Sequence, residues 1–167
     1  RGLGDVYKRQ LFMSPNFKIK PGIGALLTWP ITSHLIRLLF AGRYRSWVPA
    51  NEEQARFWTT RQPISALIEM QQVVDWANKQ SLESIQIPLA TMYMGNDPTV
   101  NSTAAIRAHN RFSNAYNQLI KVELEGDAKD HVFCGDICGP QRTKWTISAF
   151  ESFLKNLPDE NLTHHRG

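Results

Sequence analysis

The order of strand-like and helix-like segments in the second half of the chain constrains the fold more than any other feature of the sequence. A strand pattern at residues 87–94 is followed by a helix pattern, "STAAIRAHNRFSNAY", for which Asn101 or Ser102 is the expected cap. A second strand pattern, "NQLIKVELEG", precedes a second helix pattern, "QRTKWTISAFESFLKNL". Strands that alternate with helices pair in parallel through right-handed crossovers. The sequence therefore predicts an α/β fold with a parallel sheet.

The first half of the chain adds one strand and a long helical insert. The run "QLFMSPNF" at residues 10–17 predicts a strand that leads into a loop. Residues 22–40 have helical periodicity, which Pro30 is expected to divide. We expect their large apolar face to join the core, and the alternative is that it lines a lipid-like site. A short helix capped by Asn51 is expected at residues 51–57 in an otherwise irregular stretch, and "ISALIEMQQVVDWANKQ" predicts an amphipathic helix.

Charge and hydropathy argue against two classes of partner. Of the net charge of +4, half comes from the first ten residues, and the other residues are nearly balanced, with 16 basic and 14 acidic side chains. There is no stripe of Lys and Arg interleaved with aromatic residues, so we do not expect nucleic-acid binding. The sequence has no apolar run long enough for a transmembrane segment and no secretory signal pattern, so we expect a cytoplasmic location.

Both ends of the chain are set aside from the fold. The segment "GDVYKRQ" resembles a translated sequencing adaptor that recurs at the ends of fragmentary environmental proteins. We therefore expect residues 1–10 to be such an artefact or a disordered arm, and we place the start of the native fold near Leu11. Pro158 is expected to stop the last helix, and residues 158–167 to form a frayed tail.

Two loops that follow predicted strands hold side chains suited to catalysis. Asp97 follows the strand at residues 87–94, and His131 follows the next strand along the chain. The carboxyl ends of neighbouring parallel strands meet at one edge of a sheet, so these side chains can meet there. An aspartate that accepts from an imidazole N–H orients a catalytic base. The alternatives are that Asp97 only shapes the "GNDP" turn and that His131 is a solvated loop residue.

The two cysteines lie on the loop of His131. Cys134 and Cys138 form a C-x-x-x-C pair with no second pair, so we do not predict a metal site. We expect free thiols that pack the loop in a reducing cytoplasm. A minor alternative makes Cys134 a nucleophile beside His131, but it leaves Asp97 unexplained.

The segments around these residues resemble the C-terminal half of an α/β-hydrolase. "IPLATMYMGNDPTV" resembles the strand and loop of the catalytic acid, and "DHVFCGDICGP" resembles the histidine loop of the carboxylesterase and monoacylglycerol-lipase-like branch. "LFMSPNF" resembles the strand after the nucleophile helix, and "RFWTTRQPISALIEMQQVV" the end of the cap. The resemblance spans about residues 11–157. It implies a partial α/β-hydrolase fold, with three parallel strands, flanking helices and a helical lid insert at about residues 18–82.

The sequence departs from this family because it lacks the nucleophile. No G-x-S-x-G occurs in the chain, and the His-Gly oxyanion loop is also absent. By the resemblance, both would lie upstream of Leu11, where a signal region would also lie. The chain is then expected to supply Asp97 as the acid and His131 as the base, and to be inactive alone.

The resemblance implies hydrolysis of a small-molecule carboxylic ester by acyl transfer, with the serine supplied by the missing N-terminal half of the domain. It implies no cofactor and no metal. A peptidase or thioesterase of the same fold remains open, as does a non-catalytic α/β binding or structural domain. The aromatic and aliphatic side chains of the lid favour an apolar acyl group. The residues expected to form this lid and pocket are Trp29, Leu38, Phe40, Trp47, Phe57 and Trp58.

Overall fold

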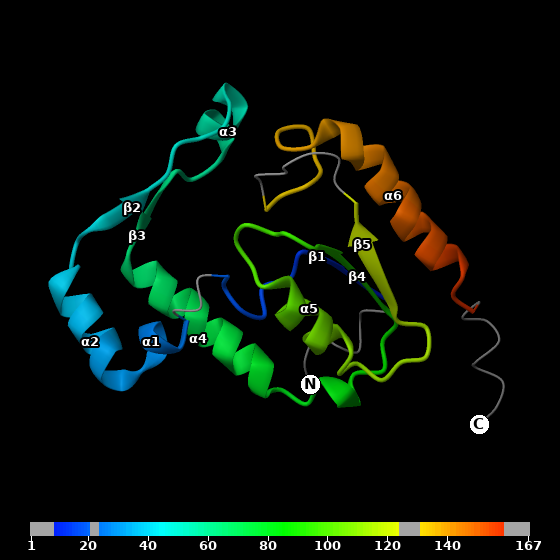
Figure 1. Cartoon of the computed structure of the whole chain (residues 1–167), viewed down its shortest axis with the longest axis horizontal. Helices are drawn as coiled ribbons and strands as arrows, with labels where there is room; N and C mark the ends of the chain where they lie inside the picture. Colours follow the sequence, from blue (N-terminus) through cyan, green and yellow to red (C-terminus); the bar gives the residue numbers. More distant parts are fainter. Residues whose placement is uncertain (1–8, 21–23, 124–130, 159–167) are drawn as a thin grey trace.

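The computed structural model describes residues 9–20, 24–123 and 131–158, so the expectations for the two ends fall largely outside it. Figure 1 shows a parallel sheet with α5 and α6 beside it, and an insert between β1 and β4 that extends away from the sheet. The elements follow in the order β1 (Gln10–Met13), α1 (Gly24–Thr28), α2 (Pro30–Leu39), β2 (Tyr44–Ser46), α3 (Glu52–Phe57), β3 (Arg61–Pro63), α4 (Ser65–Lys79), a 3₁₀ turn (Leu82–Ser84), β4 (Leu89–Met94), α5 (Ser102–His109), β5 (Gln118–Val122) and α6 (Pro140–Lys155). We call the segment from α1 to the 3₁₀ turn the insert.

The sheet has the predicted parallel pairing. Its strand order is β1-β4-β5, and both pairs are parallel, which confirms the α/β fold class. Thr91 of β4 is in register with Phe12 of β1 and Leu119 of β5. The central strand β4 is buried almost throughout, as expected for a strand covered on both faces. The carboxyl ends of β4 and β5 therefore lie side by side at the same edge of the sheet.

The two faces of the sheet carry separate core clusters. On one face, Leu89 packs with Ala108 of α5 and with Phe112. On the other face, Met92 and Met94 pack with Val122, with Phe133 and with partly buried residues of α6. Successive side chains of β4 point to opposite faces, which explains why α5 and α6 cover different sides. Both helices thus fix the strand ends from which the loops of Asp97 and His131 begin.

The insert contains a ribbon that we did not predict. Strands β2 and β3 pair in antiparallel register, with Arg45 opposite Gln62, and α3 connects them. The expectation of an irregular stretch there is wrong apart from α3, whose Asn51 cap accepts from the backbone N–H of Gln54 as predicted. Strands of three residues are too short to show a period-2 pattern in the sequence.

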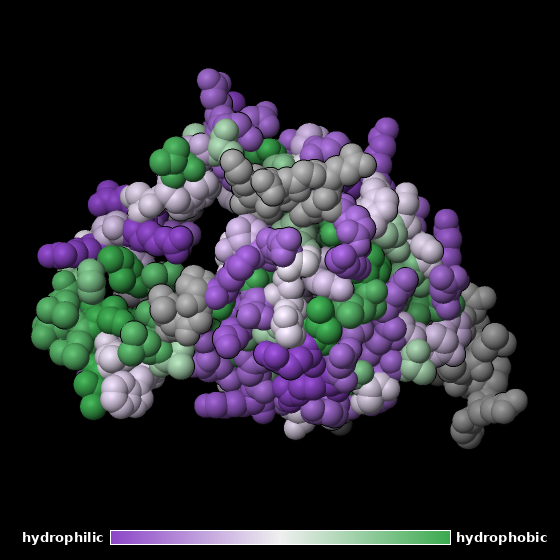
Figure 2. Space-filling view, in the orientation of Figure 1, coloured by the Kyte–Doolittle hydropathy of each residue, from purple (hydrophilic) through white to green (hydrophobic). Residues whose placement is uncertain are grey.

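The apolar face of α1 and α2 is mostly exposed. The break expected at Pro30 is confirmed, because α1 ends at Thr28 and α2 begins at Pro30. Leu27 is buried, but α2 has no buried residue, and its large apolar side chains lie on the surface that is green at the left of Figure 2. The expectation that this face joins the core is therefore wrong for α2, because none of its apolar side chains is buried by the described part of the chain. None of the described helices has the length and hydropathy needed to span a membrane.

Two element boundaries differ from the prediction. Helix α5 ends at His109, whereas the helical pattern continued to residue 116. After His109 the backbone changes to hydrogen bonds across three residues, from Arg111 to Ala108 and from Phe112 to His109. The side chain of Asn114 then accepts from the N–H of Tyr116 and donates to the carbonyl of Gln86. Such local side-chain bonds offer the backbone an alternative to the helix. The strand predicted at residues 117–126 is β5, Gln118–Val122, and residues 124–126 lie outside the described part.

Candidate active site

Asp97 uses its two carboxylate oxygens for different tasks. The carboxylate lies just after β4 and is almost fully buried, with 1% of the residue exposed. Its Oδ1 accepts hydrogen bonds from the backbone N–H groups of Thr99 and Val100, at 2.8 and 2.9 Å. These bonds are the turn chemistry that "GNDP" suggests. The turn aims the other oxygen, Oδ2, at the neighbouring loop.

His131 meets that second oxygen. Its Nδ1 lies 2.8 Å from Oδ2 of Asp97, although the two residues are separated by 34 positions in sequence. The side chain of His131 is 31% exposed, so one edge of the ring is held by a buried carboxylate and the rest reaches the surface. No described residue bonds to Nε2. A carboxylate at Nδ1 favours the tautomer with a proton on Nδ1 and a lone pair on Nε2, which is the form of a general base.

The surroundings of Asp97 keep it ionised. Burial by itself raises the pKa of Asp97, because it disfavours the charged form. The hydrogen bonds from His131, Val100 and Thr99 act in the opposite direction and together hold the pKa of Asp97 below its ordinary value of 3.8. At neutral pH the partner of His131 is therefore a carboxylate, which can stabilise an imidazolium.

The loop of His131 is closed by two glycines. Gly135 has a positive φ of 93°, a conformation that suits glycine, and Gly139 donates its N–H to the carbonyl of Gly135. A side chain on Gly139 would overlap the carbonyl of Phe133. The guanidinium of Arg142, in the first turn of α6, donates to the same carbonyl. The loop is thus anchored to α6 directly after the histidine.

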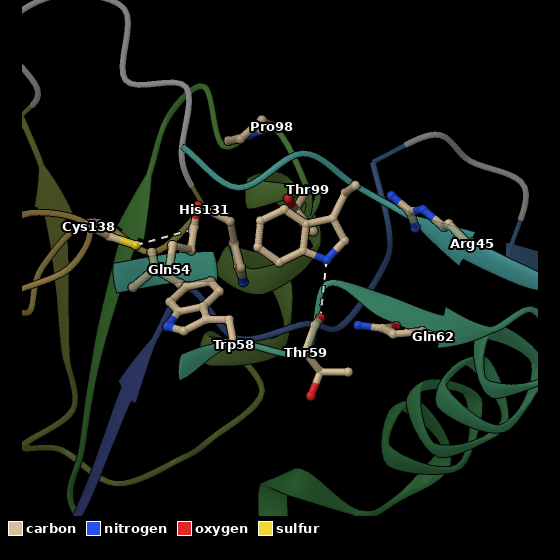
Figure 3. Close-up of a pocket in the computed structure, with 11 residues that line it drawn as sticks. Arg45, Gln54, Trp58, Thr59, Gln62, Pro98, Thr99, His131 and Cys138 are labelled. Atoms are coloured by element: carbon tan, nitrogen blue, oxygen red, sulfur yellow. Dashed lines mark hydrogen bonds between the residues drawn. The ribbon is translucent and has the colours of Figure 1, made fainter. Parts of the chain in front are cut away.

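A pocket of about 550 Å³ opens beside His131 (Figure 3). Its walls come from the ribbon and α3 on one side and from the loops of Asp97 and His131 on the other. Asn51 donates to the carbonyl of Ile137, and Gln54 donates to Sγ of Cys138, so α3 is bonded to the histidine loop. The lining residues are Arg45, Trp47, Gln54, Trp58, Thr59, Gln62, Pro98, Thr99, His131, Val132 and Cys138.

The six residues predicted for the lid and pocket divide into two groups. Trp47 and Trp58 line the pocket beside His131, and their rings make an edge-to-face contact at 6.1 Å. The other four lie elsewhere on the insert and are exposed: Trp29, Leu38, Phe40 and Phe57.

The prediction missed the polar residues of the pocket wall. Arg45, Gln54 and Gln62 line the pocket, and Gln54 is buried with its amide oxygen accepting from the N–H of Ala50. Their only signal in the sequence is that they interleave with aromatic residues between positions 43 and 62. That interleaving gave no sign of which side chains share a face, because the ribbon itself was not predicted.

The cysteines occupy different surroundings. Cys134 packs against the core cluster on the α6 face and does not line the pocket, whereas Cys138 lines it. Neither forms a disulfide bond. The expectation that the pair only packs the loop therefore fits Cys134 and is incomplete for Cys138. Within the described ranges, no group of three or more His, Cys, Asp and Glu side chains is arranged to hold a metal ion.

Another histidine, His109, is buried and provides a contrast. His109 ends α5, and its Nδ1 lies 2.9 Å from the hydroxyl of Thr91 on β4. Burial lowers the pKa of His109, and the residue does not line the pocket. Its surroundings are those of a structural histidine. Of these two histidines, only His131 combines a carboxylate partner with access to the pocket.

The three-stranded parallel sheet, its flanking helices and the long insert match part of an α/β-hydrolase fold. One solved structure that the chain resembles is that of a monoglyceride lipase from Saccharomyces cerevisiae, studied as a soluble variant in complex with a substrate analogue. The two share 10% sequence identity and superpose with a TM-score of 0.58 over 92% of this chain and 55% of the lipase. The chain thus spans about half the length of that structure. No protein-family model and no curated protein matches the sequence.

Proposed function

We propose that this chain is the C-terminal part of a serine hydrolase that acts on carboxylic esters, and that it supplies the acid and the histidine of a catalytic triad. The observation that carries the proposal is the bond between Nδ1 of His131 and Oδ2 of Asp97 at the edge of the pocket. A buried carboxylate that is held by two backbone N–H groups is a fixed partner for the imidazole. The order of acid and histidine along the chain also agrees with α/β-hydrolases.

In the proposed reaction, Nε2 of His131 accepts the proton of a serine hydroxyl that another part of the protein supplies. The serine oxygen forms a bond to the ester carbonyl carbon, and the alcohol leaves with the proton that His131 returns. Water then cleaves the acyl-serine, with His131 again taking and returning the proton. Asp97 stays ionised throughout and stabilises the imidazolium. The oxyanion donors also come from outside this chain, so we expect it to be inactive alone.

The insert has the position of a lid in this proposal. It lies between β1 and β4 in sequence and provides one wall of the pocket, including Trp47 and Trp58. Those rings give an ester substrate an apolar surface beside His131. Neither Cys134 nor Cys138 forms a disulfide bond, which is compatible with a reducing compartment, and we include a cytoplasmic location in the proposal.

The proposal is tested by reading the source DNA in frame upstream of Leu11. We expect a G-x-S-x-G between a strand and a helix, roughly 20–40 residues before Leu11, because the nucleophile sits in a strand–turn–helix unit ahead of the next strand. The extended protein should then hydrolyse p-nitrophenyl butyrate and be labelled at that serine by a fluorophosphonate. Thioester and peptide substrates measured in parallel decide between the same-fold activities. An open reading frame that continues upstream without this motif would contradict the proposal.

A further inference from the structure

The pocket beside His131 is lined by a fixed positive charge. Among the described lining residues, Arg45 is the permanent cation, His131 and Cys138 are the other ionisable groups, and none is an aspartate or glutamate. The carboxylate of Asp97 is buried behind His131 and does not line the pocket. Glu52 and Glu53, in the first turn of α3, are exposed and do not line it either. Arg45 is therefore the fixed charge that a ligand meets on the described walls of the pocket.

Arg45 differs from the other arginines of the insert. Arg43, Arg56 and Arg61 each place their guanidinium over an aromatic ring, at 5.7, 5.1 and 4.0 Å from the centroid. Arg37 forms an ion pair with Glu69. Among the described residues, Arg45 has neither kind of partner, and its donors remain available to a ligand. A guanidinium with free donors matches the geometry of a carboxylate.

The rest of the pocket extends from this charge toward His131. Figure 3 shows Arg45 and Gln62 on the side of the pocket away from Cys138, with the amide of Gln62 adding a second polar group beside Arg45. The edge-to-face pair of Trp47 and Trp58 supplies aromatic surface in the same pocket. A ligand with an apolar body and one anionic end thus finds a surface for each part.

We propose that this pocket selects substrates that carry an anionic group, above all a carboxylate, at the end remote from the ester. The carboxylate pairs with Arg45 and Gln62, the apolar body lies against Trp47 and Trp58, and the ester reaches His131. Only the part of this inference that concerns the position of the ester rests on the proposed hydrolase function. The charge preference itself belongs to binding and can be measured on this chain, whether or not the chain supports hydrolysis.

The test compares three probes of equal length that differ in charge: 6-phenylhexanoate, 6-phenylhexanamide and 6-phenylhexylammonium. Equilibrium dialysis of the full chain gives their affinities, and the indole N–H signals of Trp47 and Trp58 in ¹H–¹⁵N spectra locate the site. We expect the anion to bind most tightly and the cation most weakly, with about a fivefold difference, as is typical of one partly solvated charge pair. Added salt should reduce the difference.

Variants distinguish the effect of the charge on Arg45 from the effect of the net charge of the protein. Arg45→Gln should remove the preference for the anion and leave the affinity for the amide unchanged, and Arg45→Glu should invert the preference. Arg56→Gln is the matched control, because it removes the same charge from the same insert outside the pocket lining. The proposal is overturned by equal affinities for anion and cation, by equal effects of Arg45→Gln and Arg56→Gln, or by binding that leaves both indole signals unmoved. A failed search for an upstream nucleophile would overturn the hydrolase function but not these affinities.

Discussion

At the scale of single residues, Asp97 has both of the roles that the sequence suggested for it, in the turn and beside His131. As a turn residue it accepts from Thr99 and Val100, and as an orienting acid it accepts from His131. The turn role does not compete with the second role but fixes the direction of the second oxygen. Arg45, Gln54 and Gln62 had no comparable signal, because their importance depends on a pocket that exists only after the insert folds against the sheet.

Asp97→Asn should lower the free energy of unfolding near neutral pH by about 1.5–3 kcal/mol, the usual contribution of hydrogen bonds to a charged group. Because the pKa of Asp97 is lowered by folding, its contribution is fully present above the ordinary value of 3.8 and is lost as the pH falls through the folded-state pKa. Urea titrations at several pH values should show the difference between wild type and variant shrinking in that acidic range. Asp136→Asn, at an exposed position on the neighbouring loop of His131, is the control. A difference that stays constant with pH would contradict this account.

His109 leads to a separate prediction about pH. Burial lowers the pKa of His109, so its contribution to stability is fully present above its ordinary value of 6.5 and decreases as the pH falls toward the folded-state pKa. His109→Gln should therefore flatten the dependence of unfolding free energy on pH just below 6.5. The measurement is a series of denaturant titrations across that range. An unchanged slope would show that His109 is not the group responsible.

At the scale of elements, the sequence pattern predicted the long helices and the buried strand but did not predict the short strands. Helices α4 and α6 and the buried strand β4 were predictable because each presents a clear pattern over many residues. The three-residue strands β2 and β3 were not predictable, because they pair with each other only after α3 has brought them together. The end of α5 was missed because three-residue backbone bonds at Arg111 and Phe112, followed by the local side-chain bond of Asn114, replace the helical bonds after His109.

The junction between the histidine loop and α6 leads to a prediction about a glycine. Gly139→Ala should destabilise the protein by about 1–3 kcal/mol, because the added methyl group overlaps the carbonyl of Phe133 and the backbone has to shift. Gly95→Ala is the matched control, because a methyl group there meets only the flexible end of Lys121, at 3.6 Å. Thermal unfolding of both variants measures the difference. Equal melting temperatures would show that the loop can relax without cost.

At the scale of the whole molecule, the sheet has an exposed edge. Strand β1 pairs with β4 on one side and with no described strand on the other. Leu11 and Met13 of β1 are 42% and 43% exposed. An edge strand with apolar side chains is a template for pairing with other chains.

We therefore expect the chain by itself to aggregate at moderate concentration. Leu11→Lys should reduce this aggregation, because a charge on an edge strand opposes pairing. Val48→Lys adds the same charge at an exposed position outside the sheet and should have little effect. Light scattering against concentration compares the two variants. A cooperative, high-melting monomer without any substitution would contradict the expectation.

The central claim is that His131 acts as the catalytic base of an ester hydrolase, oriented by Asp97. The most direct measurement is the turnover of a p-nitrophenyl ester by the protein extended through its own upstream coding sequence, with His131→Ala compared with His34→Ala. His34 lies on α2 and does not line the pocket. We predict that His131→Ala lowers kcat by about a thousandfold or more while the melting temperature is retained, and that His34→Ala leaves kcat unchanged. Turnover of the His131→Ala protein within about threefold of wild type would contradict the claim, because loss of a true triad histidine costs far more than that.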